Sequence, residues 1–276
     1  MSLRRPALQA LAVLATALAA SPALAQGPRG AAAPPPVLTG DPTRRDITVP
    51  DSVPNISGVW QPQTFFRTIK PMDGSETPFL PWAKKFFLDR SAAEARGEPL
   101  FDPNANCLPS GVPRVLPTPY PYDIVQTADA IMIGIEVMHS FRIIHMDGKP
   151  MPADFKPSYL GYSRGHWEGE ALVIETTGLN GFTQVDEEGR PKSSAIKVTE
   201  RITKVAPDIL EDTFVIDDPN TYSKPYTARS RFKWSPTYRL SEYICEENNR
   251  NKPDASGKLR HGEGALSVLH AQEKKK

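Results

Sequence analysis

Carboxylates interrupt the apolar faces of segments whose patterns predict β-strands. Side chains alternate between the two faces of a strand, so every second residue shares a face. On this basis three acidic residues fall among Ile, Val, Leu and Phe side chains: Glu200 in 195–205, Asp212 in 209–217 and Glu242 in 238–245. A buried charge needs a proton, a cation or a hydrogen-bonding partner. We therefore expect a polar cluster within an apolar interior.

The segment 130–146 contains the expected partners of these carboxylates. Alternation places Glu136 with Arg142 on one face and His139 with His145 on the other, and does not decide which face points inward. Opposed carboxylates in a low-dielectric cavity have their pKa values pushed apart, which suits general acid/base catalysis. The predicted catalytic residues are Glu200, Glu242, Arg142, Glu136, His139 and His145. The alternative is a structural ion-pair network, chiefly Arg142 with one glutamate.

The sequence predicts no organic cofactor and no metal. A phosphate-cradling glycine loop and a dinucleotide fingerprint after a strand are both missing from it. Two histidines with several carboxylates could bind zinc, iron or manganese. The spacing of a His-Glu-x-x-His helix is absent, so a divalent metal is the minority interpretation.

Aromatic residues in the predicted strands could line a pocket for a partly apolar, aromatic or terpenoid ligand. The candidates are Tyr162, Trp167, Tyr226, Phe232 and Trp234. The alternative is that they only pack in the core.

Short predicted strands with tight turns must position these residues. Strands are expected at about 122–128, 130–138, 141–146, 159–167, 170–177, 195–205, 209–217, 225–234 and 238–245. They predict a mainly β protein, an antiparallel meander that closes into a barrel of calycin or lipocalin type. One helix is expected over 82–96, between Pro81 and Gly97, and a Pro-rich loop over 98–121. Gly58-Val59-Trp60 is similar to the Gly-x-Trp opening of lipocalin barrels.

The amino-terminal segment predicts export. Residues 1–25 read as a signal peptide, with Arg4 and Arg5, an apolar run and cleavage after Ala25. The segments that follow are a Pro/Ala/Gly-rich leader over 26–53, one barrel domain over 54–248 and a polar tail over 249–276. A periplasmic or secreted protein meets an oxidising compartment, which favours a disulfide between Cys107 and Cys245 over two buried thiols.

The composition limits the classes of partner that this chain is expected to bind. The 276 residues include 33 Lys and Arg against 32 Asp and Glu, which argues against a general nucleic-acid binder. The apolar run of the signal peptide is short for a membrane span, so no stable insertion is expected after cleavage. A small-molecule ligand or substrate is the expected partner, and the oligomeric state is left open.

Several separate segments, in order, resemble a family of exported bacterial proteins that carry a Trp-Glu-Gly-Asp/Glu-x-Leu-Val-x-x-Thr signature. The resemblance covers about 105–248 and rests on GYSRGHWEGEALVIETT at 161–177, Asp147 to Pro150, Glu200-Arg201, Asp218-Pro219 and EYICEEN at 242–248. Where the family pattern has Arg, His and Asp, this chain has Lys149, Met151 and Glu170. The resemblance implies an exported domain in which Glu136, Arg142 and Glu200 are functionally important. It implies no particular activity.

Two functions from different classes are compatible with these features. The first is a cofactor-independent barrel enzyme, a lyase, isomerase or hydrolase, with Glu200 or Glu242 as acid or base and Arg142 polarising an oxygen. The second is a periplasmic carrier or binding protein for a small apolar ligand, without catalysis. Three carboxylates near apolar faces favour the enzyme by a small margin.

Overall fold

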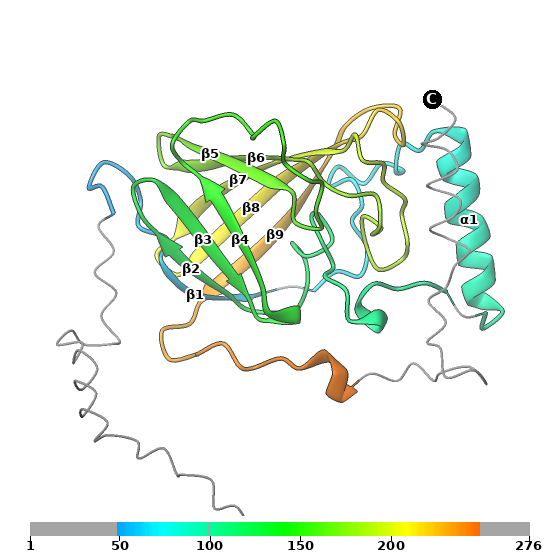
Figure 1. Ribbon diagram of the computed structural model, residues 1–276, viewed down its shortest axis with the longest axis horizontal. Helices are drawn as coiled ribbons and strands as arrows, with labels where there is room; N and C mark the ends of the chain where they lie inside the picture. The colour runs from blue at the N-terminus through cyan, green and yellow to red at the C-terminus, as the bar shows by residue number, and fades with distance from the viewer. Residues whose placement is uncertain (1–48, 64, 99, 249–276) are drawn as a thin grey trace, which may run out of the picture. The chain divides into compact units, whose positions relative to one another are not determined.

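The chain forms a closed nine-stranded β-barrel with one α-helix, as the sequence predicts (Figure 1). The computed structural model describes residues 49–63, 65–98 and 100–248. The strands are β1 (Gly58–Pro62), β2 (Tyr122–Gln126), β3 (Ala130–Ile135), β4 (Ser140–His145), β5 (Tyr162–Glu168), β6 (Ala171–Thr177), β7 (Lys197–Ala206), β8 (Ile209–Asp217) and β9 (Tyr226–Trp234). The helix is α1 (Pro81–Ala95), and the 3₁₀ turns are η1 (Asn104–Asn106), η2 (Val137–His139) and η3 (Cys245–Asn248).

The barrel closes through β1, and the predicted strand at 238–245 is wrong. β1 pairs antiparallel with both β2 and β9, which leaves no free sheet edge. After β9 the chain enters Pro236, whose ring nitrogen cannot donate to a ladder. Backbone N–H groups in the segment 236–244 instead bond to side chains of the barrel's η2 turn. This segment therefore runs outside the sheet.

One neighbouring pair departs from the expected antiparallel meander. β4 and β5 run parallel and pair only at Ile144 with Ser163 and His145 with Arg164. Parallel neighbours need a long crossover connection, which residues 146–161 supply without a helix. The first residues of β4 pair with β3 alone. We call this interrupted pairing between β4 and β5 the seam.

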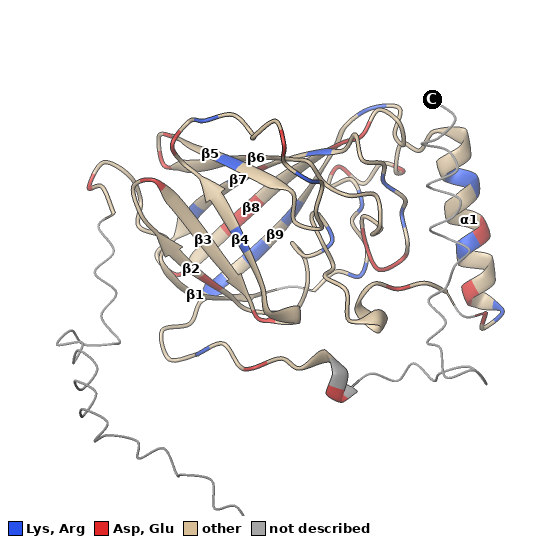
Figure 2. Cartoon of the chain, in the orientation of Figure 1, with Lys and Arg blue, Asp and Glu red and all other residues tan. Residues whose placement is uncertain are grey.

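Alternation along the strands sorts the interior from the surface as predicted. In β7 and β8 the faces that carry Glu200 and Asp212 are buried with their apolar neighbours. Outward-facing residues of β8 and β9 carry both signs of charge (Figure 2), and Glu211 lies 2.6 Å from Arg231 and 3.5 Å from Arg229. Trp234, one of the aromatic residues predicted to line a pocket, is the last residue of β9 and is 44% exposed at the end of the sheet.

The Pro-rich loop is buried where it approaches the barrel. Residues 110–118 are all buried, and Val115 and Leu116 reach the interior cavity. The hydroxyl of Tyr122 donates to the carbonyl of Val115 at 2.9 Å. Gly111 has φ +73°, and a Cβ there would lie 2.7 Å from the carbonyl oxygen of Tyr159. A side chain at this position is therefore excluded by both backbone conformation and space.

The predicted disulfide between Cys107 and Cys245 is present, with a Cα–Cα distance of 5.6 Å. It joins the Pro-rich loop to the segment after β9 rather than to a strand. The cross-link closes a loop that spans 138 positions. Bridges of this kind stabilise a fold mainly because they lower the conformational entropy of the unfolded chain.

The helix is confirmed with a shift of one residue at each end. Pro81 opens it, and Gly97 follows it with φ +74°. Its Phe87 ring stacks on Phe79 at 5.3 Å, and the guanidinium of Arg190 lies 4.9 Å from the centre of the same ring.

Among the described residues, no helix combines the length and apolar character that crossing a bilayer requires. The predicted signal peptide over 1–25 and tail over 249–276 lie outside the described residues, as does the leader up to residue 48.

Candidate functional site

A charged cluster lies inside the barrel, and its centre is the pair of Arg142 on β4 and Glu200 on β7. These side chains are 3% and 1% exposed. The two terminal guanidinium nitrogens donate to the two carboxylate oxygens, one of them at 2.8 Å from Nη1 to Oε1. Such a two-pronged arrangement matches the planar geometry of both groups. Burial alone would lower the pKa of Arg142, but the charge and the hydrogen bonds of Glu200, together with smaller contributions from Asp212 and Tyr122, outweigh burial and raise it.

Two hydroxyl groups complete the binding of the guanidinium. Its Nε donates to Ser163 Oγ on β5 at 2.9 Å, and Nη2 donates to Thr176 Oγ1 on β6 at 2.5 Å. The two hydroxyl oxygens are themselves 2.9 Å apart. Arg142 therefore links β4 to β5, β6 and β7 through side chains. This linkage spans the seam, where the backbone ladder is short.

Asp212 on β8 is the second carboxylate of the interior, and no second cation lines the cavity beside it. It is buried, and its Oδ1 has no hydrogen-bond partner among the described residues. Burial raises the pKa of Asp212 well above its usual range, the charge of Glu200 raises it further and Arg142 lowers it. Because Glu200 takes the guanidinium, Asp212 is the carboxyl whose protonated form is favoured by its surroundings.

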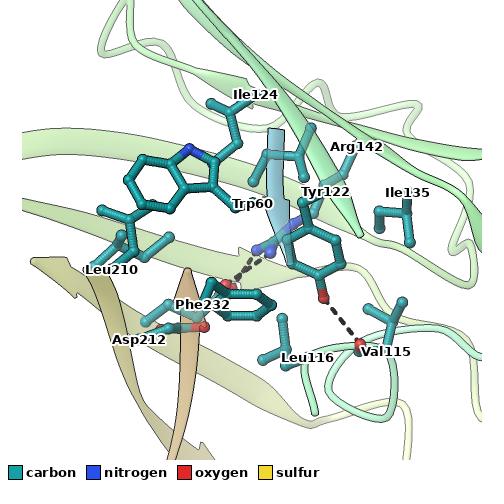
Figure 3. A pocket seen from close by; sticks show the side chains of 13 residues that line it. Trp60, Val115, Leu116, Tyr122, Ile124, Ile135, Arg142, Leu210, Asp212 and Phe232 are labelled. Carbon is teal, nitrogen blue, oxygen red and sulfur yellow. Dashed lines mark hydrogen bonds and ion pairs between the residues drawn. The ribbon is translucent and has the colours of Figure 1, made fainter. Parts of the chain in front are cut away.

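The space beside this cluster is small. A cavity of about 20 Å³ is lined by Asp212, Arg142 and Glu200; Figure 3 shows the first two among the apolar side chains. The remaining walls come from Trp60, Val115, Leu116, Tyr122, Ile124, Ile133, Ile135, Ile202, Leu210 and Phe232. A cavity of this size holds one water molecule.

A much larger pocket lies on the outside of the barrel at the seam. Its volume is about 350 Å³, within the range of small-molecule sites. Outward-facing residues of β4 form one wall, and the crossover segment 155–162 forms another. The pocket is lined by Pro109, Phe141, Arg142, Ile143, His145, Phe155, Ser158, Tyr159, Leu160, Gly161 and Tyr162. We call it the seam pocket.

Aromatic rings dominate the seam pocket. The His145 and Tyr162 rings stack at 4.4 Å with an interplanar angle of 12°. Phe155 meets Tyr162 edge-on at 5.4 Å and 70°. The Ser158 hydroxyl accepts a hydrogen bond from the Gly161 N–H at 2.9 Å and so shapes the turn before β5.

The structure brings together only part of the predicted catalytic set. Arg142 and Glu200 meet as expected, and His145 lies on the opposite face of β4 in the seam pocket. Glu136 and His139 lie at η2, where left-handed residues Met138 and His139 break the strand alternation. The arrangement of Arg142 with one glutamate matches the structural ion-pair alternative.

The other three predicted residues lie around the segment after β9. Glu136 accepts hydrogen bonds from the Tyr238 hydroxyl and the Ser241 N–H, both at 2.8 Å. His139 Nε2 accepts from the Tyr243 N–H at 2.9 Å. Glu242 belongs to this segment and is exposed, so the expectation that it faces the core is wrong. The error follows from the strand assumed for 238–245.

The aromatic residues predicted to line a pocket are likewise found at different sites. Tyr162 lines the seam pocket and Phe232 the interior cavity. Tyr226 is buried in the core, Trp167 is partly buried and packs against the core, and Trp234 is exposed. Phe155 and Ser158 also line the seam pocket, and they were not predicted because the crossover that contains them has no periodicity to indicate where a side chain points.

In the described part of the chain, no group of three or more His, Cys, Asp or Glu side chains is placed to hold a metal ion. The expected lack of cofactors stays a prediction. No protein-family model matches the chain, and no curated protein is similar to it.

We predict strong coupling between Arg142 and Glu200. Arg142→Met or Glu200→Leu alone leaves an uncompensated buried charge and should lower the free energy of unfolding by about 3–5 kcal/mol. The double variant should lose much less than the sum, because both charges are gone. Urea unfolding of the four proteins measures this.

The control for this cycle is the half-exposed pair of Arg164 and Glu175, an Arg–Glu pair 3.2 Å apart on β5 and β6. The same substitutions there should couple by less than about 1 kcal/mol. Equal coupling in the two cycles would contradict the special role of the buried pair.

We also predict a pH dependence from Asp212. Its folded-state pKa is raised, so its contribution is fully present below the unfolded value of about 3.9 and is lost as pH rises through the folded pKa. Over that window wild-type stability should fall relative to Asp212→Asn by about 1.4 kcal/mol per pH unit. Urea titrations between pH 4 and 8 test this, with Glu211→Gln on the outer face of β8 as control. A pH-independent difference between wild type and Asp212→Asn would refute the assignment.

Proposed function

We propose that this chain is an exported β-barrel protein that binds a small, partly apolar molecule in the seam pocket. The supporting observation is the contrast in space: about 350 Å³ at the seam against about 20 Å³ in the interior. Binding sites for small molecules are mostly apolar and aromatic with a few polar groups, which describes the seam pocket. Carriage or sensing of a ligand needs no more than this.

Export is part of the proposal. It rests on the signal-peptide pattern over 1–25 and on the disulfide between Cys107 and Cys245, since such bridges persist in oxidising compartments. The resemblance to exported bacterial proteins agrees with it. The ligand would then be a molecule met outside the cytoplasm.

A substitution that fills the seam pocket should abolish binding. Ile143→Trp places a large ring in the wall, whereas Met132→Trp adds the same ring at the cross-strand neighbour outside the lining. The two residues are 43% and 42% exposed, so neither substitution overfills the core. We expect Ile143→Trp to weaken binding of the fluorescent apolar probe N-phenyl-1-naphthylamine by about tenfold or more, a loss of at least 1.4 kcal/mol, and Met132→Trp to leave it unchanged.

Fluorescence titration of the three proteins at one temperature gives the comparison. Thermal melts show that each variant is folded. Equal affinity in all three would place the probe elsewhere and would reject the seam pocket as the binding site.

A second candidate is the cofactor-independent acid/base enzyme, and Asp212 is the observation that favours it. A buried carboxyl group with a raised pKa can donate a proton or hydrogen bond to a developing oxyanion. Arg142 and Glu200 would then polarise and orient, and the chemistry would be that of a lyase, isomerase or hydrolase. A substrate would reach Asp212 only if lining side chains such as Leu116 move.

This candidate predicts that turnover of any substrate found depends on Asp212. Asp212→Asn should lower kcat by about 100-fold or more, and Glu211→Gln on the same strand should not. Full activity of folded Asp212→Asn would eliminate the acid role, while leaving binding at the seam untouched.

A further inference from the structure

We propose that the ligand of the seam pocket is an uncharged aromatic molecule, of one or two fused rings with an oxygen substituent. This inference rests on the proposed binding function and specifies its ligand class. The residue pattern of the strands leaves both aromatic and terpenoid ligands open. The pocket geometry favours aromatic compounds over saturated, terpenoid-like ones and over carboxylates.

The arrangement of rings supports an aromatic ligand. The parallel stack of His145 on Tyr162 already joins two flat surfaces within the lining, and Phe155 adds an edge contact to the same tyrosine. Aromatic rings prefer such offset-stacked and edge-to-face contacts, which contribute beyond the burial of area. A further ring that enters the pocket can repeat both geometries. A saturated ring gains only the burial.

Phe141 extends the same surface outward. It is the most exposed of the large apolar side chains described, at 63%, and it lines the pocket from β4. Its neighbour Ile143 on the same face is also largely exposed. A ligand that covered these side chains would remove apolar area from water, which is favourable.

The charges of the lining support an uncharged ligand. The lining contains no Lys, Asp or Glu, and its only permanently charged residue is Arg142. All three nitrogens of that guanidinium are engaged by Glu200, Ser163 and Thr176 on the barrel side. Apart from the imidazole of His145, no side chain of the lining is left to pair with a carboxylate in the pocket. Burial of an unpaired charge is costly.

Polar atoms in the lining suit an oxygen substituent. Tyr159 and Tyr162 contribute phenol groups, and Ser158 contributes a hydroxyl. Burial raises the pKa of Tyr159, which keeps that phenol in the neutral form that can donate a hydrogen bond. A hydroxyl, ether or carbonyl oxygen on the ligand can accept this bond without bringing charge.

The test compares three probes of similar size on the full-length purified protein. The probes are 2-naphthol, decahydro-2-naphthol and 2-naphthoate, which differ in aromaticity or charge. We expect 2-naphthol to bind about five- to tenfold more tightly than decahydro-2-naphthol and at least about tenfold more tightly than 2-naphthoate. Isothermal titration or displacement of N-phenyl-1-naphthylamine gives the affinities.

Tyr162→Leu links the preference to the rings. It removes the partner of both His145 and Phe155, so the ratio of naphthol to decahydronaphthol affinity should fall towards one. Phe66→Leu replaces a 44% exposed aromatic residue outside the lining and should leave the ratio unchanged. If Tyr162→Leu does not fold, the wild-type ratios alone decide.

Each outcome separates the two proposals. Equal affinities for 2-naphthol and its saturated analogue would overturn the aromatic inference while keeping a seam-pocket binding protein. Tighter binding of 2-naphthoate would overturn the uncharged class. Failure of all three probes and of N-phenyl-1-naphthylamine to bind would overturn the inference together with the binding function.

Discussion

The buried pairing of Arg142 with Glu200 is the constraint on which the barrel interior depends. A guanidinium and a carboxylate removed from water each need hydrogen-bonding partners. Here the two terminal nitrogens of the guanidinium donate to the two oxygens of the carboxylate. The remaining Nε bonds to Ser163. Asp212 lies beside this pair, its Oδ1 has no hydrogen-bond partner among the described residues, and burial raises its pKa well above the usual range.

The same pair explains how the barrel closes across the seam. A parallel neighbour with only two paired positions is a weak point in an otherwise antiparallel wall. Arg142 lies on β4 and reaches β5, β6 and β7 through hydrogen bonds, so side chains supply part of the continuity that the backbone lacks. Outside the wall, the crossover that makes β5 parallel leaves room against β4. The seam pocket is the result.

The interior and the seam pocket offer different chemistry, and this separates the two functional candidates. The interior has a carboxyl group with a raised pKa and room for one water molecule, which suits proton transfer only if the packing opens. The seam pocket has room and aromatic surface but no charge free to react. Binding therefore needs no rearrangement, whereas catalysis at Asp212 does. Arg142 belongs to the walls of both spaces, so substitutions there affect both.

Sequence patterns alone determined strands β2 to β9, the helix, the disulfide and the burial of Glu200, because each depends on local periodicity or on the pairing of only two cysteines. Tertiary structure decided what periodicity cannot carry. The end of the barrel is closed by β1, since Pro236 and the side chains of Glu136 and His139 draw the segment after β9 away from the sheet. The direction of β5, and with it the seam pocket, depends on where a crossover of irregular backbone packs. That packing is a sum of long-range contacts, and no spacing of residues along the chain encodes it.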